Sequence, residues 1–328
     1  MSAEAADGIL LSVCVPSHER PLRLRWLLNA LAEQTLDRSQ WEVVVCDDSR
    51  SPQTAALLAS HPLAADGTLR VQRLPPGSGG SAARQRNVAW RAARGATVLF
   101  TDDDCRPPSD WLAGALAAAG RHPGAIVQGA TQPDPDEAHL VAAPHARTQA
   151  ITPPVPWAQT CNVLYPRAVL EAVGGFEEHM AAGEDTELAL RAQATGVAYV
   201  GAPEVVTHHA VEAGSLRGKL ATIPRWRGLA LVVARHPQVR EHLVAGIFWR
   251  TSHALLPLAL FGLLGARRTG GRSLLAAVPY VLSARGSYGP SWRGRARALA
   301  EVPGRAVVDV AEIGALARGS VEQRTLIL

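Results

Sequence analysis

An apolar run at residues 96–101 ends in three consecutive carboxylates, Asp102, Asp103 and Asp104. A short β-branched and aromatic stretch of this kind, bounded by turn residues, predicts a buried strand. If that strand crosses an open α/β sheet, the aspartates emerge together at its carboxyl edge, where such sheets bind their ligands. Adjacent carboxylates repel one another, and a hard divalent cation that also binds phosphate oxygens relieves this repulsion. A solvated Asp-rich turn is the alternative that these residues leave open.

The segments around this run alternate between strand and helix patterns. Strands are predicted at residues 9–15, 41–46 and 68–74, and helices at residues 23–34, 52–60 and 82–94. Such alternation is typical of helices packed on both faces of a mostly parallel central sheet. The predicted fold class is therefore α/β and Rossmann-like, with Cys14 and Cys46 as buried thiols in neighbouring strands.

The cysteine pattern limits the compartment and the chemistry. The chain has 328 residues, 47% of them hydrophobic, which is enough for one large or two modest domains. Its four cysteines are widely spread and include no C-x-x-C pair, which argues against a zinc knuckle or a disulfide framework. Residues 1–8 are small and acidic rather than leader-like. We therefore expect a reducing, cytoplasmic environment.

Positive charge is concentrated in the last third of the chain. The segment between Gly214 and Arg305 contains fifteen basic residues and only two acidic ones, Glu241 and Glu301. Its net charge is therefore +13, in a chain whose total is +4. A basic segment mixed with apolar runs is typical of binding to an anionic membrane surface or to nucleic acid. Because the rest of the chain is then acidic, at −9, we expect no nucleic-acid ligand. Residues 216–328 are predicted to be a separate helical region.

Two apolar stretches in this region, residues 243–266 and 273–284, are too short to be convincing membrane spans. The uninterrupted part of the first, residues 251–266, would reach about 24 Å as a helix, against about 30 Å of hydrocarbon. Arginines at 267, 268 and 272 separate the stretches, so we expect a hairpin that dips into the cytoplasmic leaflet, making the protein monotopic or peripheral. Possible interfacial anchors are Trp226, Trp249 and Trp292. A soluble helical subdomain is the alternative.

Several motifs, taken in order, resemble those of one enzyme family. They are the strand ends at residues 15–21 and 45–49, Arg86-Asn87 before a helix, and Thr-Asp-Asp-Asp at residues 101–104. Over residues 9–215 the set resembles the family 2 inverting glycosyltransferases with the GT-A fold. The resemblance extends to Asn162, to the Gly-Gly-Phe-Glu loop at residues 174–177 and to Gly183-Glu184-Asp185. It implies a nucleotide-binding half at about 9–104 and an acceptor half at about 105–215, within a catalytic domain of residues 1–215.

The resemblance assigns roles on the donor side. It implies a nucleoside pocket lined by Pro16, Ser17 and Glu19, with Asp48 on the base, Arg86 on the diphosphate and Asp102 near the ribose. It further implies that Asp104, together with Asp103, holds Mg²⁺ or Mn²⁺ between the diphosphate oxygens. The glycine-rich residues 75–81 precede the predicted helix at residues 82–94. Such a stretch lets the backbone approach a phosphate closely, although a plain loop fits these residues equally. A histidine is common in the family near His208, which would be a further metal ligand; a structural role for His208 and His209 is the alternative.

The chemistry also requires a general base. Displacement at an anomeric carbon needs a group that takes the proton of the acceptor hydroxyl while the diphosphate leaves on the opposite face. The resemblance places this base at Asp185, with Glu184 as second choice. The alternative is that both acids only stabilise a helix N-terminus. On the acceptor side the implied residues are Asn162, Gly183 and Trp157, although Trp157 also fits a core position.

Together these observations predict an inverting glycosyltransferase that moves a hexosyl group from a nucleotide-diphosphate sugar to an acceptor hydroxyl, in cell-envelope or lipid-linked glycan synthesis. A metal-dependent nucleotidyltransferase is the enzymatic rival, but residues 16–20 do not form the glycine-rich basic loop that it needs. A non-catalytic, membrane-tethered sugar-nucleotide binder is the third reading. Departures from the family pattern, including Glu19 and Arg20 in place of Asn and Glu, leave the base and the sugar open.

Overall fold

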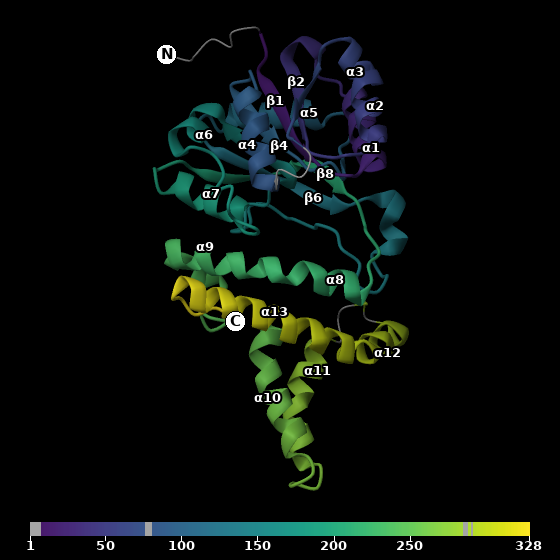
Figure 1. Cartoon of the computed structure of the whole chain (residues 1–328), viewed down its shortest axis with the longest axis vertical. Coiled ribbons are helices and arrows are strands. Elements are labelled where there is room, and N and C mark those ends of the chain that lie inside the picture. Colours follow the sequence, from purple (N-terminus) through teal and green to yellow (C-terminus); the bar gives the residue numbers. More distant parts are fainter. Residues whose placement is uncertain (1–7, 76–80, 285–287, 290) are drawn as a thin grey trace. The chain divides into compact units, whose positions relative to one another are not determined.

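The computed structural model describes residues 8–75, 81–284, 288–289 and 291–328, so most of the glycine-rich stretch at 75–81 lies outside the described residues. Two compact units make up the chain (Figure 1). The first runs to Val141 and from Arg147 to Glu212, and the second comprises Ala142–Ala146 and Ala213–Leu328. Each unit is described separately below.

The first unit is built on one eight-stranded sheet of order β3-β2-β1-β4-β7-β6-β8-β5. Its strands are β1 (Leu11–Ser17), β2 (Trp41–Asp47), β3 (Leu69–Arg73), β4 (Thr97–Phe100), β5 (Cys105–Arg106), β6 (Ile126–Pro133), β7 (Val163–Pro166) and β8 (Tyr199–His209). The first four in sheet order are parallel, and β7 then joins antiparallel to both β4 and β6. The sheet is therefore parallel on the side of the predicted nucleotide-binding half and mixed beyond it.

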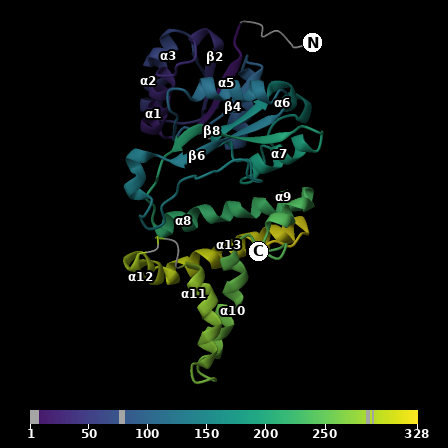
Figure 2. The same ribbon diagram turned by 180° about the vertical axis from the view of Figure 1, so that it is seen from behind.

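Helices cover both faces of this sheet, as the alternating pattern predicted. One face packs on α1 (Pro21–Ala32), α2 (Pro52–Ser60), α3 (Pro62–Ala65) and α5 (Trp111–Arg121). The opposite face packs on α4 (Ala82–Ala92), α6 (Arg167–Val173) and α7 (Glu184–Gln193). In Figures 1 and 2, which view the molecule from opposite sides, α4 lies in front of the sheet in one and α5 in the other. Cys14 and Cys46 are buried thiols under the second face, as expected.

β1 extends beyond its neighbour β4 at the carboxyl edge of the sheet. The sequence predicts that this strand ends at Val15, but it continues to Ser17. Beyond Cys14 it pairs only with β2, because β4 ends at Phe100 opposite Cys14. Pro16 is tolerated in the strand because its missing N–H falls where no second ladder needs it. The chain after β4 is thereby free to leave the sheet at its carboxyl edge.

The second unit is helical. It contains α8 (Leu216–Thr222), α9 (Leu229–Arg235), α10 (Thr251–Gly265), α11 (Val278–Ala284), α12 (Trp292–Ala300) and α13 (Val302–Gln323), with 3₁₀ turns at Ile223–Gly228, Pro237–His242 and Arg272–Ala277. The apolar stretch that starts at residue 243 becomes helical only at Thr251, because residues 244–248 form a turn closed by a bridge between Val244 and Phe248. Among the described residues, no helix combines the length and apolarity that crossing a bilayer requires.

A buried polar cluster joins α10 to α13 within this unit. His253 Nε2 lies 3.2 Å from Oε2 of Glu312, and the Tyr280 hydroxyl donates to Asp309 at 2.8 Å. Arg250 lies 3.4 Å from the Glu312 carboxylate. Apolar contacts among Leu256, Ala259 and Tyr280 surround the cluster. Since Arg250 and His253 at the start of α10 both contact Glu312 of α13, we assign the cluster to holding α10 on α13.

Candidate active site

The three aspartates leave β4 at the carboxyl edge of the sheet, where the sequence placed them. Asp103 and Asp104 are each only 6% exposed, so neither belongs to a solvated turn. Arg20, which follows β1, lies 2.6 Å from Asp104 Oδ2 and 3.7 Å from Asp103 Oδ1. Burial and the negative charge of Asp104 raise the pKa of Asp103 to about 7. A cation at these carboxylates is therefore strongly favoured, and the guanidinium of Arg20 supplies one.

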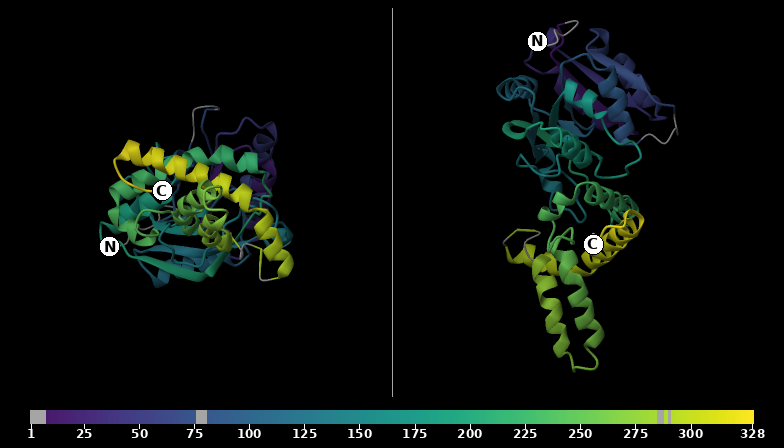
Figure 3. Two further views of the ribbon diagram at one scale, coloured as in Figure 1. Left: turned by 90° about the horizontal axis from the view of Figure 1, so that it is seen from below. Right: turned by 90° about the vertical axis from the view of Figure 1, so that its left-hand side faces the viewer.

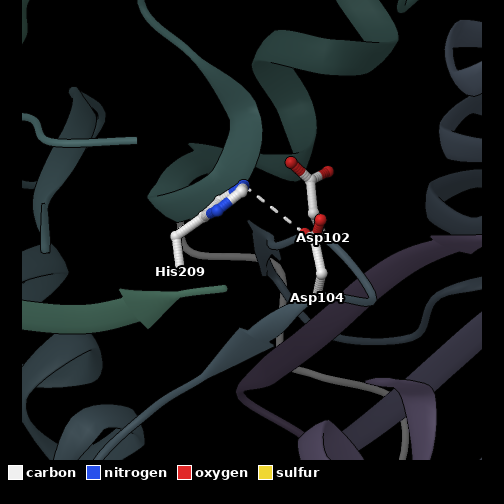
Figure 4. A group of neighbouring side chains, drawn as sticks. All are labelled: Asp102, Asp104 and His209. Atoms are coloured by element: carbon white, nitrogen blue, oxygen red, sulfur yellow. Dashed lines mark ion pairs between the residues drawn. The ribbon is translucent and has the colours of Figure 1, made fainter. Parts of the chain in front are cut away.

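His209, rather than His208, joins the aspartates. In Figure 4 its imidazole points toward Asp104, and Nε2 lies 3.4 Å from Asp104 Oδ1. The ring's Nδ1 lies 2.8 Å from the carbonyl oxygen of Ala210, which can only accept, so Nδ1 carries the proton. Nε2 is thus the ring nitrogen that faces Asp104. His208 points elsewhere and lines a separate pocket with Trp26 and Arg106.

The ligand atoms of Asp102, Asp104 and His209 lie within 4.8 Å of one another. Carboxylate oxygens with one imidazole nitrogen form a donor set that suits Mn²⁺ or Mg²⁺, with the carboxylates as hard ligands. The hydrogen bond from His209 to a backbone carbonyl is the outer contact that orients a metal-binding imidazole. These residues thus fit the expected divalent cation, provided that the Arg20 guanidinium withdraws from Asp104.

Arg86 on α4 links the aspartates to the start of α7. Its Nη2 donates to Asp102 at 2.7 Å and its Nη1 donates to Glu184 at 3.0 Å. Burial disfavours the charge of this guanidinium, but Asp102 and Glu184 outweigh burial and raise the pKa of Arg86. For Asp102, burial is likewise outweighed by Arg86, and the pKa of its carboxyl is lowered. Arg86 therefore stays charged, as does Asp102, and Nε of Arg86 is a buried donor with no partner among the described residues.

Asp185 lies in the first turn of α7. Gly183 caps this helix with φ at +81°, in the left-handed region that glycine adopts without steric penalty. Burial, and then the neighbouring charge of Glu184, raises the pKa of Asp185 to about 7, against the opposing effect of Arg86. A carboxyl whose pKa lies near neutrality is suited to accept a proton at physiological pH. Both acids also lie where they would stabilise the N-terminus of the helix.

The residues expected around the nucleoside gather at the ends of β1 and β2. Asp48 is buried, and its carboxylate lies 2.6 Å from Nδ1 of the exposed His18. Glu19 has φ at +53°, an unusual conformation outside glycine, and accepts a hydrogen bond from the Arg50 amide at 2.5 Å. The hydroxyl of Ser17 is buried and has no partner among the described residues. Backbone strain beside an unsatisfied buried hydroxyl is typical of a ligand site.

The acceptor-side residues separate into two groups. The carbonyl oxygen of Trp157 accepts a hydrogen bond from the Thr186 hydroxyl at 2.7 Å, so the loop that carries this half-buried tryptophan adjoins Asp185. Asn162 is 1% exposed; it accepts from the Trp111 indole and donates to the carbonyls of Ala130 and Val205. These bonds use its amide inside the protein. We therefore reinterpret Asn162 as a residue that ties β7 to its neighbours rather than as an acceptor contact.

The loop at residues 174–178 is fixed by α4. Asn87 accepts from the Phe176 amide at 2.8 Å and donates to the Phe176 carbonyl at 2.8 Å. A Cβ added at Gly175 would lie 2.4 Å from Asn87 Oδ1, so only glycine allows this approach. The Phe176 ring also lies 5.8 Å from the Arg86 guanidinium, an arrangement that favours cation–π attraction. Adjacent residues Arg86 and Asn87 thus position a charge and a loop at one site.

Comparison with known proteins agrees with this geometry. Residues 12–174 match the model of the family described as Glycosyl transferase family 2. Glycosyltransferase AglE of Haloferax volcanii is 26% identical over 204 residues, with 61% of this chain and 66% of the relative covered. Poly(ribitol-phosphate) beta-N-acetylglucosaminyltransferase TarS of Staphylococcus aureus is 35% identical over 111 residues, which are 34% of this chain and 19% of TarS. The chain thus spans between about a fifth and about two thirds of these relatives.

Solved structures share the fold. Mannosyltransferase PcManGT from Pyrobaculum calidifontis, solved with GDP-Man and Mn²⁺, superposes with a TM-score of 0.58 at 21% identity, covering 98% of this chain and 90% of that one. Residues 1–349 of TarS, solved with UDP-GlcNAc, give a TM-score of 0.54 at 20% identity and cover 97% of this chain and 93% of that one. The sheet, its helices on both faces and the sequence motifs lead to one conclusion: the chain has the GT-A fold and belongs to glycosyl transferase family 2.

Proposed function

We propose that the protein transfers a hexosyl group from a nucleoside-diphosphate sugar to an acceptor hydroxyl, with inversion at the anomeric carbon. One observation supports this most: the acidic edge of β4 and the start of α7 meet through a single guanidinium, that of Arg86. A donor-binding group and a candidate base are thereby held at one site.

On the donor side, Asp102, Asp104 and His209 would hold a divalent cation, which when bound neutralises the diphosphate leaving group. Asp48 and the Ser17 hydroxyl, which are both buried, would line the nucleoside pocket that the family resemblance implies. Arg86, which stays charged, would stabilise the negative charge that develops as the bond from sugar to diphosphate breaks. The structures of PcManGT with GDP-Man and of TarS with UDP-GlcNAc support a nucleotide-sugar donor, without deciding its base or sugar.

On the acceptor side, Asp185 would accept the proton of the hydroxyl as its oxygen attacks the anomeric carbon. Its pKa of about 7 makes the proton transfer favourable while leaving a useful fraction ionised at neutral pH. A base on the side opposite the leaving group produces inversion, so the configuration of the product tests the arrangement. Glu184, held by Arg86, would act on Asp185 rather than on the acceptor.

For the acceptor we propose a hydroxyl-rich glycan of the cell envelope or a lipid-linked precursor. The relative named for poly(ribitol-phosphate) supports a polymeric polyol acceptor for at least one member of the family. Trp157, adjacent to Asp185, would provide an apolar surface on which a sugar ring could stack.

The decisive experiment offers a panel of UDP-, GDP- and dTDP-sugars with Mn²⁺ and follows donor hydrolysis and transfer to sugar acceptors by NMR. We expect one donor to be consumed with release of the nucleoside diphosphate and an inverted product. Release of pyrophosphate from a nucleoside triphosphate would instead support a nucleotidyltransferase. Binding of a donor without turnover on any acceptor would favour a non-catalytic sugar-nucleotide binder.

A further inference from the structure

Helices α10 and α11 of the second unit form a hairpin that extends away from α13 (Figures 1 and 3). Its inner face is closely packed. A Cβ added at Gly262 would lie 2.5 Å from the Ser273 carbonyl oxygen, and the Ser273 hydroxyl donates to the Gly262 carbonyl at 2.7 Å. The base of the hairpin is held by the buried contacts of His253 with Glu312. It is therefore a well-defined element rather than a loose extension.

The outer faces of this hairpin are apolar. Phe261 is 74% exposed, Leu264 84% and Leu275 74%, and six further side chains are at least 42% exposed: Leu258, Leu260, Leu263, Leu274, Val278 and Leu282. Residues 251–284 contain no aspartate, glutamate or lysine. So many exposed apolar side chains on one well-packed element mark an interaction site.

Arginines stand at both ends of the apolar surface. Arg250 precedes α10, and Arg267, Arg268 and Arg272 lie exposed in the turn that leads to α11. A second copy of the chain would bring identical positive charges together at such a surface, which disfavours self-association. An anionic lipid bilayer offers both the apolar phase and the opposite charge.

We propose that the α10–α11 hairpin embeds in the interfacial layer of an anionic bilayer, with its long axis close to the membrane plane. Entry tip first would carry the three arginines of the turn about 22 Å inward, the length of α10, and so near the bilayer centre. Each arginine there lowers partitioning by about a hundredfold. An in-plane hairpin keeps the three arginines of the turn at phosphate depth while its apolar body lies below.

The first test measures sedimentation of the full-length protein with vesicles of phosphatidylcholine and phosphatidylglycerol, at low salt. Replacing Arg267, Arg268 and Arg272 together with glutamine is expected to weaken binding by about a hundredfold, since each contributes about fivefold. Leu264→Glu is expected to weaken it at least about tenfold. Leu22→Glu, at a leucine that is 57% exposed in the first unit, is the matched control and is expected to bind normally. Circular dichroism verifies that each variant is folded.

The second test measures depth. All four native cysteines are buried, so a thiol-reactive fluorophore would label an added surface cysteine selectively. Labels at Leu260→Cys and Leu264→Cys, one helical turn apart on the same face of α10, are read with lipids that carry quenchers at known depths. An in-plane hairpin places both labels at about the same shallow depth, whereas tip-first entry places residue 264 deeper by about 6 Å.

Three results would overturn the proposal. Absence of vesicle binding by the full-length protein at low salt is the first. Dimerisation without lipid that Leu264→Glu abolishes would show that the surface serves self-association, and a deep label at residue 264 would exclude the in-plane orientation. None of these measurements depends on transferase activity, so the proposal and the proposed function fail or stand separately.

Discussion

Replacing Arg20 with glutamine is expected to tighten the binding of Mn²⁺ to the protein in the absence of nucleotide. The guanidinium lies 2.6 Å from Asp104 Oδ2, on a carboxylate that the cation would share with Asp102 and His209. The metal therefore has to displace a resident positive charge before it can bind. Glutamine keeps much of the side chain's length but removes that charge, so the variant isolates the competition.

The structure sets the size of the effect. Two charges with centres about 4 Å apart interact by about 4 kcal/mol at an effective dielectric constant of about 20. Two features reduce this energy. The Arg20 side chain is 35% exposed, so solvent screens its interaction with Asp104. Arg20 also lies 3.3 Å from Glu212, and it keeps this ion pair when the metal displaces it from Asp104. We therefore expect that displacing Arg20 costs Mn²⁺ binding about 1.4 kcal/mol, so Arg20→Gln should bind Mn²⁺ about tenfold more tightly.

Isothermal titration with Mn²⁺ is the assay. Arg23→Gln serves as the matched control, because Arg23 lies three residues away and makes its own 2.6 Å ion pair with Glu137, outside the aspartate cluster. We expect the control to bind Mn²⁺ as the unmodified protein does. An unchanged or weaker affinity in Arg20→Gln would refute the idea that Arg20 and the metal compete for Asp104.

Three further predictions concern the base and the helical unit. Asp185→Asn is expected to lower the transfer rate by a factor of about 10² to 10⁴ while donor affinity stays nearly intact, and Glu184→Gln is expected to lower the rate less. Full activity of Asp185→Asn in a steady-state assay would contradict the role assigned to Asp185. The base acts when deprotonated, and burial and Glu184 raise the pKa of Asp185 to about 7, so the transfer rate is expected to rise with pH through about 7. Glu184→Gln removes a negative charge and is expected to shift this rise to lower pH. A pH–rate profile that is flat between about 6 and 8 would count against this expectation. Glu312→Gln removes the carboxylate nearest to both His253 and Arg250 and is expected to cost about 2 to 3 kcal/mol in the free energy of unfolding, measured by urea denaturation. An unchanged midpoint would show that the cluster does not hold α10 on α13.

Much of the fold followed from local patterns. Strands buried on both faces read as continuous apolar runs, and α1, α2 and α4 showed helical spacing, so the parallel half of the sheet was predictable. The position of the aspartates followed from the same reasoning, because residues after a parallel strand emerge at one edge of the sheet.

Which histidine lies beside Asp104 was not predictable in this way. Successive residues of a strand point to opposite faces, so the choice between His208 and His209 depends on knowing the strand's register. β8 continues through His208 to His209 and shifts in register against β6 between Gly129 and Ala130. That irregularity, which involves residues about 70 positions apart, decides which imidazole reaches Asp104.

Two side chains took roles that only long-range packing reveals. Arg20 was noted in the sequence as a departure from the family pattern, but its ion pair joins residues 84 positions apart and has no local signal. The family resemblance implied an acceptor-side role for Asn162, but three hydrogen bonds inside the protein use its amide.

The most direct test of the central claim is the dependence of donor binding on metal through Asp104. Binding of the nucleoside-diphosphate sugar found in the panel is measured by calorimetry with Mn²⁺ and with EDTA, for the unmodified protein, Asp104→Asn and Asp110→Asn. Asp110, an exposed acid that makes no capping hydrogen bond on α5, controls for the loss of a carboxylate. We predict that the unmodified protein and Asp110→Asn bind the donor strongly with Mn²⁺. Asp104→Asn is expected to lose the part of the donor affinity that depends on metal, because the diphosphate and the carboxylates repel each other without the cation. Equal donor affinity in EDTA and in Mn²⁺ would contradict the account.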